Sequence, residues 1–403
     1  MNNKRKILIT GGAGNIGGAL ASRLSEDPEN QVIVVDDLST GGRGHRTVDP
    51  IQAYQVMNCL FLCRRLAGYF HNCIRHFADL EPQAQIRIVA QPNADNAPFR
   101  FDEHPRIDIV SRSQFQNDAI GMITGSESPD FVYLAGWSDP LYRQICHKLR
   151  GSIPVVMGMD NQWNGTVKQQ VMSRLLWPWV HTFCNRIWIP GLYQYEYARH
   201  LGFHRNRILT GMYAADCERY WNIGEATDFR SATKRLLFIG NMWQDKGVVE
   251  LVEAFNGLAA VFPNWRLVLV GGGPLVDIYR NASDRIDVLG FLQPAQMADL
   301  IGGCHAFCLP SYHDAWAVVI HEACCMGLPV VATDVCGATS AFVHEGYNGF
   351  LCAARDQASL QAALHKLLSL PNDELAEFGR RSRLLSGQTT PDAWAAKVRS
   401  LLV

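Results

Sequence analysis

Short apolar runs alternate with amphipathic stretches along most of the chain. Between residues 86 and 221 the runs are IRIVA, IDIVS, FVYLA, IPVVMG, RIWIP and RILTG; from residue 236 onward they are LLFIG, WRLVLVGGG, IDVLGF, AFCLPS, PVVATD and GFLC. Runs of this length, separated by helical stretches of about 10–15 residues, are typical of parallel sheets. We therefore predict an α/β fold with two Rossmann-like domains, residues 84–221 and 222–403, whose parallel sheets face a cleft. Residues 213–231 would form the hinge, and the last helix would cross back over it.

The first 50 residues carry a separate pattern of strand, glycine-rich turn, helix and strand. Gly11, Gly14 and Gly17 would open the helix, and Asp36 stands 19 residues after Gly17 at a strand end. Such glycines let the backbone approach a dinucleotide pyrophosphate, while the acid holds a ribose hydroxyl. The following residues to position 83 allow one or two helices but show no convincing caps. Residues 1–83 are thus predicted to be a βαβ fragment followed by a poorly patterned helical segment.

Composition describes an ordinary globular protein. The 403 residues include 48% apolar and 19% charged residues, enough for two or three domains with large cores. A formal net charge of −1 gives no indication of a nucleic-acid partner. No apolar run approaches the roughly 18 residues of a membrane span, and the N-terminus lacks a signal-peptide pattern. We expect a cytoplasmic protein.

Twelve cysteines raise the question of a metal site. Cys304 and Cys308 have no matching second pair downstream, so buried, reduced thiols are the better explanation. A looser group further upstream leaves a zinc site open as an alternative, although its spacing matches no known finger; its members are Cys59, Cys63, Cys73, His71 and His76. We expect no metal.

Candidate phosphate-binding elements follow three strands of the second series. Gly240 and Asn241 end the first of these strands, and Lys246 stands at the start of the next helix. There the ammonium group and the helix dipole would face an anion together. Glycines after the second strand allow close backbone approach to a ligand; they are Gly272 and Gly273, with Phe291 following the third strand.

The segment SYHDAWAVVIHEACCMGLPVVATDVCG, residues 311–337, is the most informative in the chain. Asp314 would lie on a loop and Glu322 on the following helix. The backbone N–H groups of Ala317, Val318 and Val319 would be unpaired at the first helical turn, which suits a phosphate or a sugar oxygen. Glu322, one turn further, could reach a ribose or sugar hydroxyl.

These elements, in this order, resemble the donor domain of retaining family-4 glycosyltransferases of GT-B fold. The resemblance implies a nucleoside-diphosphate-sugar donor and no required cofactor or metal. It implies that Lys246 neutralises the leaving diphosphate, Glu322 holds the ribose and Asp314 holds the donor sugar; Ser311 belongs to the same motif. The chain departs from the family pattern at Asn241, where arginine is usual, at Asp314, where glutamate is usual, and at Ala317, where glycine is usual.

The first series of strands resembles the acceptor domain of the same enzymes, which implies a glycan or lipid-linked acceptor. Asp160 follows a strand and would line the cleft as a carboxylate orienting a hydroxyl, or else act as a structural cap. Asp139, in Ser-Asp-Pro, fits an ordinary helix start better. The stretch SRLLWPWVHTF, residues 173–183, has two readings: a membrane-surface patch, giving peripheral contact at the inner membrane face, or a buried helix end broken by Pro178.

Two further functions stay open. The N-terminal glycine pattern resembles that of nucleotide-sugar epimerases and dehydratases among the extended short-chain dehydrogenases, which implies NAD. However, the chain contains no Tyr-x-x-x-Lys pair, and one βαβ unit cannot enclose the cofactor. A non-catalytic nucleotide-sugar-binding protein is the other alternative. We predict a glycosyltransferase of the hexosyltransferase type, acting in polysaccharide biosynthesis.

Overall fold

The computed structural model describes residues 5–10, 30–35, 56–91, 101–118, 128–280, 282–293 and 296–402, in two compact units, Met1–Tyr54 and Gln55–Val403. In the first unit, strand β1 (Arg5–Thr10) runs parallel to β2 (Asn30–Val35), with Ile7 opposite Val32. Both predicted strands are therefore confirmed. The predicted dinucleotide-binding residues Gly11, Gly14, Gly17 and Asp36 lie outside the described residues.

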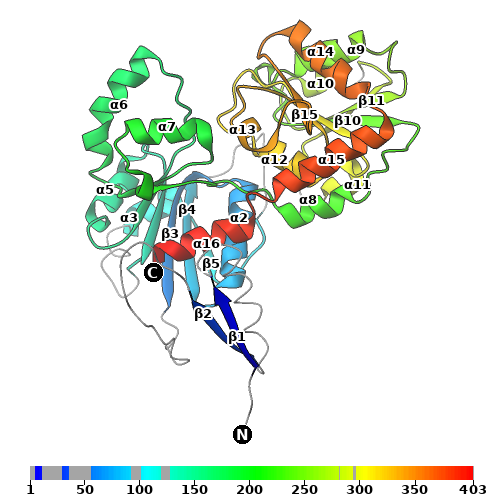
Figure 1. Cartoon of the computed structure of the whole chain (residues 1–403). Coiled ribbons are helices and arrows are strands. Elements are labelled where there is room, and N and C mark those ends of the chain that lie inside the picture. Colours follow the sequence, from blue (N-terminus) through cyan, green and yellow to red (C-terminus); the bar gives the residue numbers. More distant parts are fainter. Residues whose placement is uncertain are drawn as a thin grey trace. The chain divides into compact units, whose positions relative to one another are not determined.

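The first sheet of the second unit has seven parallel strands in the order β5-β4-β3-β6-β7-β8-β9 (Figure 1). Its strands are β3 (Met57–Arg65), β4 (Ala84–Gln91), β5 (Ile107–Ser111), β6 (Phe131–Ala135), β7 (Val155–Gly158), β8 (Arg186–Trp188) and β9 (Ile208–Leu209). Its helices are α2 (Gly68–Leu80), α3 (Arg112–Asp118), α5 (Pro140–Leu149), α6 (Val167–Val180), α7 (Leu192–His200) and the 3-10 turn η1 (Arg205–Arg207).

The segment 51–83, predicted to precede this domain, supplies the middle of its sheet instead. Strand β3 pairs with β4 on one side and β6 on the other, and α2 follows it. All five residues from Cys59 to Cys63 are buried, because a central parallel strand is covered on both faces. Such a strand shows no alternation that would distinguish it from a helix. The predicted boundary at residue 84 is wrong, and the domain begins near residue 56.

The second sheet has six parallel strands in the order β12-β11-β10-β13-β14-β15. They are β10 (Lys234–Ile239), β11 (Trp265–Val270), β12 (Ile286–Gly290), β13 (Ala306–Leu309), β14 (Val330–Thr333) and β15 (Gly349–Cys352). The helices are α8 (Cys217–Gly224), η2 (Gln244–Lys246), α9 (Val248–Gly257), α10 (Val276–Tyr279), α11 (Met297–Ile301), α12 (Val318–Cys325), α13 (Thr339–Phe342), α14 (Gln357–Leu368) and α15 (Asn372–Ser386). The prediction of two parallel-sheet, Rossmann-like domains is thus confirmed.

The chain crosses between the two sheets twice, and neither crossing falls at the predicted boundary of 221/222. Helix α8 spans that boundary, and its buried residues Cys217, Tyr220 and Ile223 belong to the core of the second sheet. The final helix, α16 (Pro391–Leu402), returns to pack against α2 of the first domain (Figure 1). Its Trp394 is fully buried and donates a hydrogen bond from Nε1 to the Met212 carbonyl at 3.0 Å. The predicted crossing back of the last helix is confirmed.

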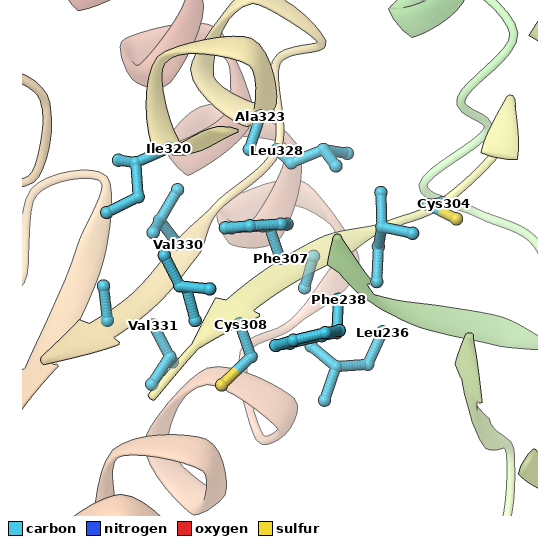
Figure 2. Packing of buried hydrophobic residues seen from close by; sticks show 14 of the residues in the cluster. Leu236, Phe238, Cys304, Phe307, Cys308, Ile320, Ala323, Leu328, Val330 and Val331 are labelled. Atoms are coloured by element: carbon cyan, nitrogen blue, oxygen red, sulfur yellow. The ribbon is translucent and has the colours of Figure 1, made fainter. Parts of the chain in front are cut away.

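The core of the second domain determines where helix α12 begins. Ile320 and Ala323 of α12 face the strands that carry Phe307 and Val330, and all four side chains are buried (Figure 2). Because this apolar face is seated on β13 and β14, the first turn of α12 is held at the carboxyl edge of the sheet. All twelve cysteines are buried and free, which confirms the prediction made for Cys304 and Cys308. No helix in the described part of the chain is long and apolar enough to cross a membrane.

Candidate active site

A cavity of about 750 Å³ lies where the carboxyl ends of strands from both sheets meet. Ala67 follows β3 and Asp160 follows β7, while Gly240 and Gly271 follow β10 and β11. Ligands of open parallel sheets bind at this edge. Gly271 has φ +141°, and a Cβ there would lie 1.7 Å from the Gly240 carbonyl oxygen, so only glycine fits this turn.

Most of the site residues predicted from the sequence line this cavity. They are Asp160, Gly240, Asn241, Lys246, Gly272, Phe291, Asp314, Ala317, Val318, Val319 and Glu322. Ser311 and Gly273 are not among its lining residues. Ser311 is fully buried, and its carbonyl accepts a hydrogen bond from Thr333 Oγ1 at 2.7 Å. The Gly273 carbonyl accepts from the Val276 N–H. Ser311 and Gly273 therefore make hydrogen bonds within the loops next to the cavity.

Lys246 and Asp314 form an ion pair on the wall of the cavity. Nζ of Lys246 lies 2.6 Å from Oδ2 of Asp314, and both side chains are about four-fifths buried. Oδ1 of Asp314 also accepts the N–H of Trp316 at 3.2 Å. Gly247, at φ +70°, turns the chain directly after Lys246, and a Cβ there would meet the Pro310 carbonyl oxygen at 2.1 Å. A bound anion would share the Lys246 ammonium group with Asp314.

The first turn of α12 offers backbone donors to the same cavity. Its N-cap residue is Ala317, in the left-handed region at φ +67° and ψ +69°, without a side-chain cap. The N–H groups of Val318 and Val319 have no acceptor within the helix, as is general for a first helical turn. A non-glycine residue in this conformation costs roughly 1–2 kcal/mol. Local strain of this kind is typical of functional sites.

Glu322 places a carboxyl group one turn further along α12. Its side chain lines the cavity, as does that of Tyr220 on α8. Burial raises the pKa of Glu322 to about 7, although Tyr220 and the nearby His321 act in the opposite direction. The carboxyl group therefore changes charge near neutral pH, and only its ionised form offers two acceptor oxygens to the two hydroxyls of a diol.

Asp160 contributes a carboxylate from the first domain. Its Oδ2 accepts a hydrogen bond from the hydroxyl of Tyr213 at 3.2 Å, and the Tyr213 ring packs edge-on against Tyr69 at 5.2 Å. The N-cap of helix α6 is Thr166, so Asp160 does not cap this helix. Of the two alternatives for Asp160, the structure therefore favours a carboxylate that lines the cleft. Asp139, by contrast, caps α5 through the N–H groups of its first turn. It has the structural role that its sequence context favours.

Two buried glutamines connect the halves of the site. Nε2 of Gln194 donates to the carbonyl of Asp160 at 3.0 Å and to that of Ala315 at 2.7 Å. Nε2 of Gln162 donates to the carbonyl of Asp314 at 3.0 Å. The backbone at Asp160 and the loop at Asp314 and Ala315 are thus connected through side-chain amides.

Sequence reasoning missed the part of the cavity formed by α2 and α8. The missed residues include Tyr69, His71, Asn72, Arg75, Tyr213, Arg219 and Tyr220. Those on α2 fall in the segment without a readable pattern, and those near α8 fall in the predicted hinge. The position of α2 directly after a buried strand was the one signal that could have found them.

Cys217, His321 and Cys325 are the described residues whose side chains converge as metal ligands could, with all three ligand atoms within 4.8 Å of one another. Nδ1 of His321 accepts the Ala215 N–H at 3.1 Å, and Nε2 donates to the Ser386 carbonyl at 2.9 Å. Both ring nitrogens are therefore engaged in hydrogen bonds, and the neutral imidazole has no lone pair left for a metal. The zinc group considered for Cys59, Cys63, Cys73, His71 and His76 does not come together in the described structure.

Residues 233–370, from β10 to the end of α14, match the family described as Glycosyl transferases group 1. The match contains Lys246, Asp314 and Glu322, three charged residues that line the cavity. Over these residues the C-terminal domain is similar to this family.

Similar proteins support the family and the fold. The chain is 29% identical over 169 residues to a glycogen synthase of Mycobacterium tuberculosis, covering 40% of each chain. The chain is 26% identical over 229 residues to a phosphatidyl-myo-inositol mannosyltransferase of Mycobacterium leprae, covering 56% of this chain and 60% of that protein. The chain thus spans about half the length of the curated relatives it matches.

The solved structures extend the likeness to both domains. The crystal structure of Anabaena HepE in complex with UDP and glucose has a TM-score of 0.63 and 17% sequence identity, covering 86% of this chain and 99% of that one. A sucrose-phosphate synthase from Thermosynechococcus elongatus has the same TM-score at 15% identity. The two parallel-sheet domains are those of the GT-B fold, as predicted.

Proposed function

We propose that this protein is a retaining glycosyltransferase that moves a sugar from a nucleoside-diphosphate sugar to a hydroxyl acceptor. The observation that carries the proposal is the convergence of three unlike groups in one cavity. The Lys246 ammonium group, the N–H groups of Val318 and Val319, and the Glu322 carboxyl group line it together. A cation and helix N–H groups suit a diphosphate, and a carboxylate suits a ribose diol.

The same groups have roles in the reaction. Departure of a nucleoside diphosphate develops negative charge, which Lys246 and the first turn of α12 would stabilise as it forms. Asp314 would hold the hydroxyls of the donor sugar and orient Lys246 through their ion pair. The acceptor hydroxyl would enter from the side of Asp160 and attack the face that the leaving group vacates, giving retention. The positive charge of Lys246 and the helix dipole of α12 would stabilise the leaving diphosphate without a metal or other cofactor.

The acceptor and the compartment belong to the same proposal. We infer a glycan or a lipid-linked hydroxyl as acceptor, in a pathway that builds polysaccharides or glycolipids; the likeness to a phosphatidyl-myo-inositol mannosyltransferase supports the lipid-linked class. Twelve buried, free thiols fit a reducing compartment such as the cytoplasm.

The proposal is tested with the full chain by thermal shift against UDP-, GDP- and ADP-sugars, with NAD as a control, followed by assays of nucleotide release. We expect one nucleotide-sugar class to raise the melting temperature. Lys246→Ala should then lower turnover by at least about 100-fold, as for the loss of one transition-state donor. Lys366→Ala is the matched control, since this lysine is exposed and paired with Glu345 at 3.4 Å. Donor binding without hydrolysis or transfer would show a binding protein, and stabilisation by NAD alone would favour the epimerase class.

A further inference from the structure

Helix α6 turns an apolar face outward. Val167, Val171, Leu175 and Trp179 follow one another at intervals of four residues, which places them along one side of the helix. All four are exposed, Val167 and Leu175 to 76% and 66%. The buried residues of this helix, Ser173 and Val180, lie on the opposite side. In most surface helices the polar face is exposed to solvent and the apolar face is buried, whereas in α6 the apolar face is exposed.

The structure contradicts one of the two readings of residues 173–183. Helix α6 continues past Pro178 to Val180, and both Trp177 and Trp179 are exposed. The buried helix end that the sequence allowed is therefore wrong. Trp177 packs on Gly202, where an added Cβ would lie 2.0 Å from the indole nitrogen. This contact joins α6 to the loop after α7, which lies beside it (Figure 1).

The surroundings of the apolar face are strongly basic. Helix α6 carries Lys168 and Arg174 and no acidic residue. Residues 140–210 contain nine lysines and arginines but two acidic residues, an excess of seven positive charges in a chain whose formal net charge is −1. One of the two acids, Asp160, lines the active-site cavity, which leaves Glu196 as the exposed acid of this stretch.

The basic residues gather at the C-terminal end of α6. Nδ1 of His147 lies 2.6 Å from the Thr182 carbonyl, which brings the end of α5, with the exposed Lys148 and Arg150, next to the end of α6. On the other side, the loop beyond Gly202 carries the exposed Arg205 and Arg207. Lys168 and Arg174 thus lie on the same helix as the stripe, and further cations lie on the segments next to its C-terminal end.

We propose that this face, defined by Val167, Lys168, Val171, Met172, Arg174, Leu175 and Trp179, is a docking surface for an anionic lipid bilayer. A helix with an apolar stripe and flanking cations lies in the plane of the interface, with its apolar side chains at the acyl boundary and its cations at lipid phosphates. Docking of two copies through this face would oppose like charges. A nucleic acid would leave the apolar stripe without a partner. A lipid surface satisfies both parts of the face.

The bilayer contact goes beyond the proposed transfer reaction and does not depend on it. It is measured with the full chain by co-sedimentation with vesicles, without any sugar donor. We expect binding to vesicles of phosphatidylcholine with about one-third phosphatidylglycerol, and weak binding to phosphatidylcholine alone. Binding should fall as salt rises, because the lipid charge is screened.

Matched variants separate the apolar and the charged contributions. Val167→Gln with Leu175→Gln should weaken binding roughly tenfold or more, since both side chains lose apolar burial in the bilayer. Ile278→Gln with Leu384→Gln is the control, because these residues are 62% and 63% exposed in the other domain. Lys168→Glu with Arg174→Glu should weaken binding by at least about fivefold per charge. Arg230→Glu with Arg280→Glu is the control, because it makes the same change of charge in the other domain.

The variants are at exposed positions, so circular dichroism and the melting temperature should stay as in the wild type. Equal binding of the α6 variants and their controls would overturn the proposal. Absence of wild-type binding to anionic vesicles would also overturn it. The same holds if the α6 substitutions abolish dimerisation or RNA binding and leave vesicle binding unchanged.

Discussion

The charge of Glu322 should couple donor binding to pH. Its pKa of about 7 means that near pH 6 roughly one molecule in ten carries the carboxylate, whereas near pH 8 about nine in ten do. If only the ionised form accepts the ribose hydroxyls, the apparent affinity for the donor should fall about tenfold from pH 8 to pH 6. At pH 8, Glu322→Gln should lower donor affinity by roughly 10- to 100-fold, the worth of a hydrogen bond to a charged group.

The same substitution should have the opposite effect on stability. Burial raises the pKa of Glu322 above its usual 4.5, so the folded protein favours the neutral form. Stability from this group is complete below about pH 4.5 and is lost as pH rises through about 7. Glu322→Gln, which is neutral at every pH, should therefore stabilise the protein at pH 8 by at most about 3 kcal/mol, with no gain near pH 4.5. Partial solvent exposure of the side chain makes this an upper bound.

The assay is calorimetric titration with the best donor nucleotide at pH 6, 7 and 8, beside denaturant unfolding at the same pH values. Glu374→Gln, an exposed glutamate in the first turn of α15, is the control for loss of one negative charge. A donor affinity that changes with pH to the same extent in Glu322→Gln and in the wild type would refute the reasoning. An unchanged affinity at pH 8 would separate Glu322 from the donor altogether.

Three other substitutions test how the site and the domains are held together. Gln194→Leu removes the amide that bridges the Asp160 and Ala315 carbonyls, and should destabilise the protein by roughly 1–3 kcal/mol in urea unfolding while lowering kcat; unchanged stability would show that the bridge is dispensable. Tyr213→Phe keeps the ring against Tyr69 but loses the bond to Asp160, so the acceptor KM should rise several-fold with the donor KM unchanged, and an effect on the donor alone would contradict the assignment. Trp394→Ala should cost about 3–5 kcal/mol, since the fully buried indole packs on Trp188 at 5.1 Å; a loss under 1 kcal/mol would mean that α16 does not hold the first domain.

The placement of Lys246, Asp314 and Glu322 in one cavity was predictable because the signals for it are local. Lys246 lies at a turn between a strand and a helix, and Asp314 and Glu322 lie on one loop and the helix after it. Each of these placements depends on a few neighbouring residues and on helix geometry. The acceptor side depends on contacts far apart in the chain, such as the bond between Tyr213 and Asp160, and these leave no local pattern.

The amino-acid sequence was sufficient to predict the parallel α/β class and the position of the cavity at the carboxyl edge, because hydrophobic period and turn chemistry act over a few residues. Which surfaces meet depends on the complete fold. It placed β3 in the middle of a sheet, sent α16 back to the first domain and left the apolar stripe of α6 facing outward. An apolar run in the sequence indicates that one face of a segment is apolar. Which other segment covers that face depends on the packing of residues that are distant in the chain.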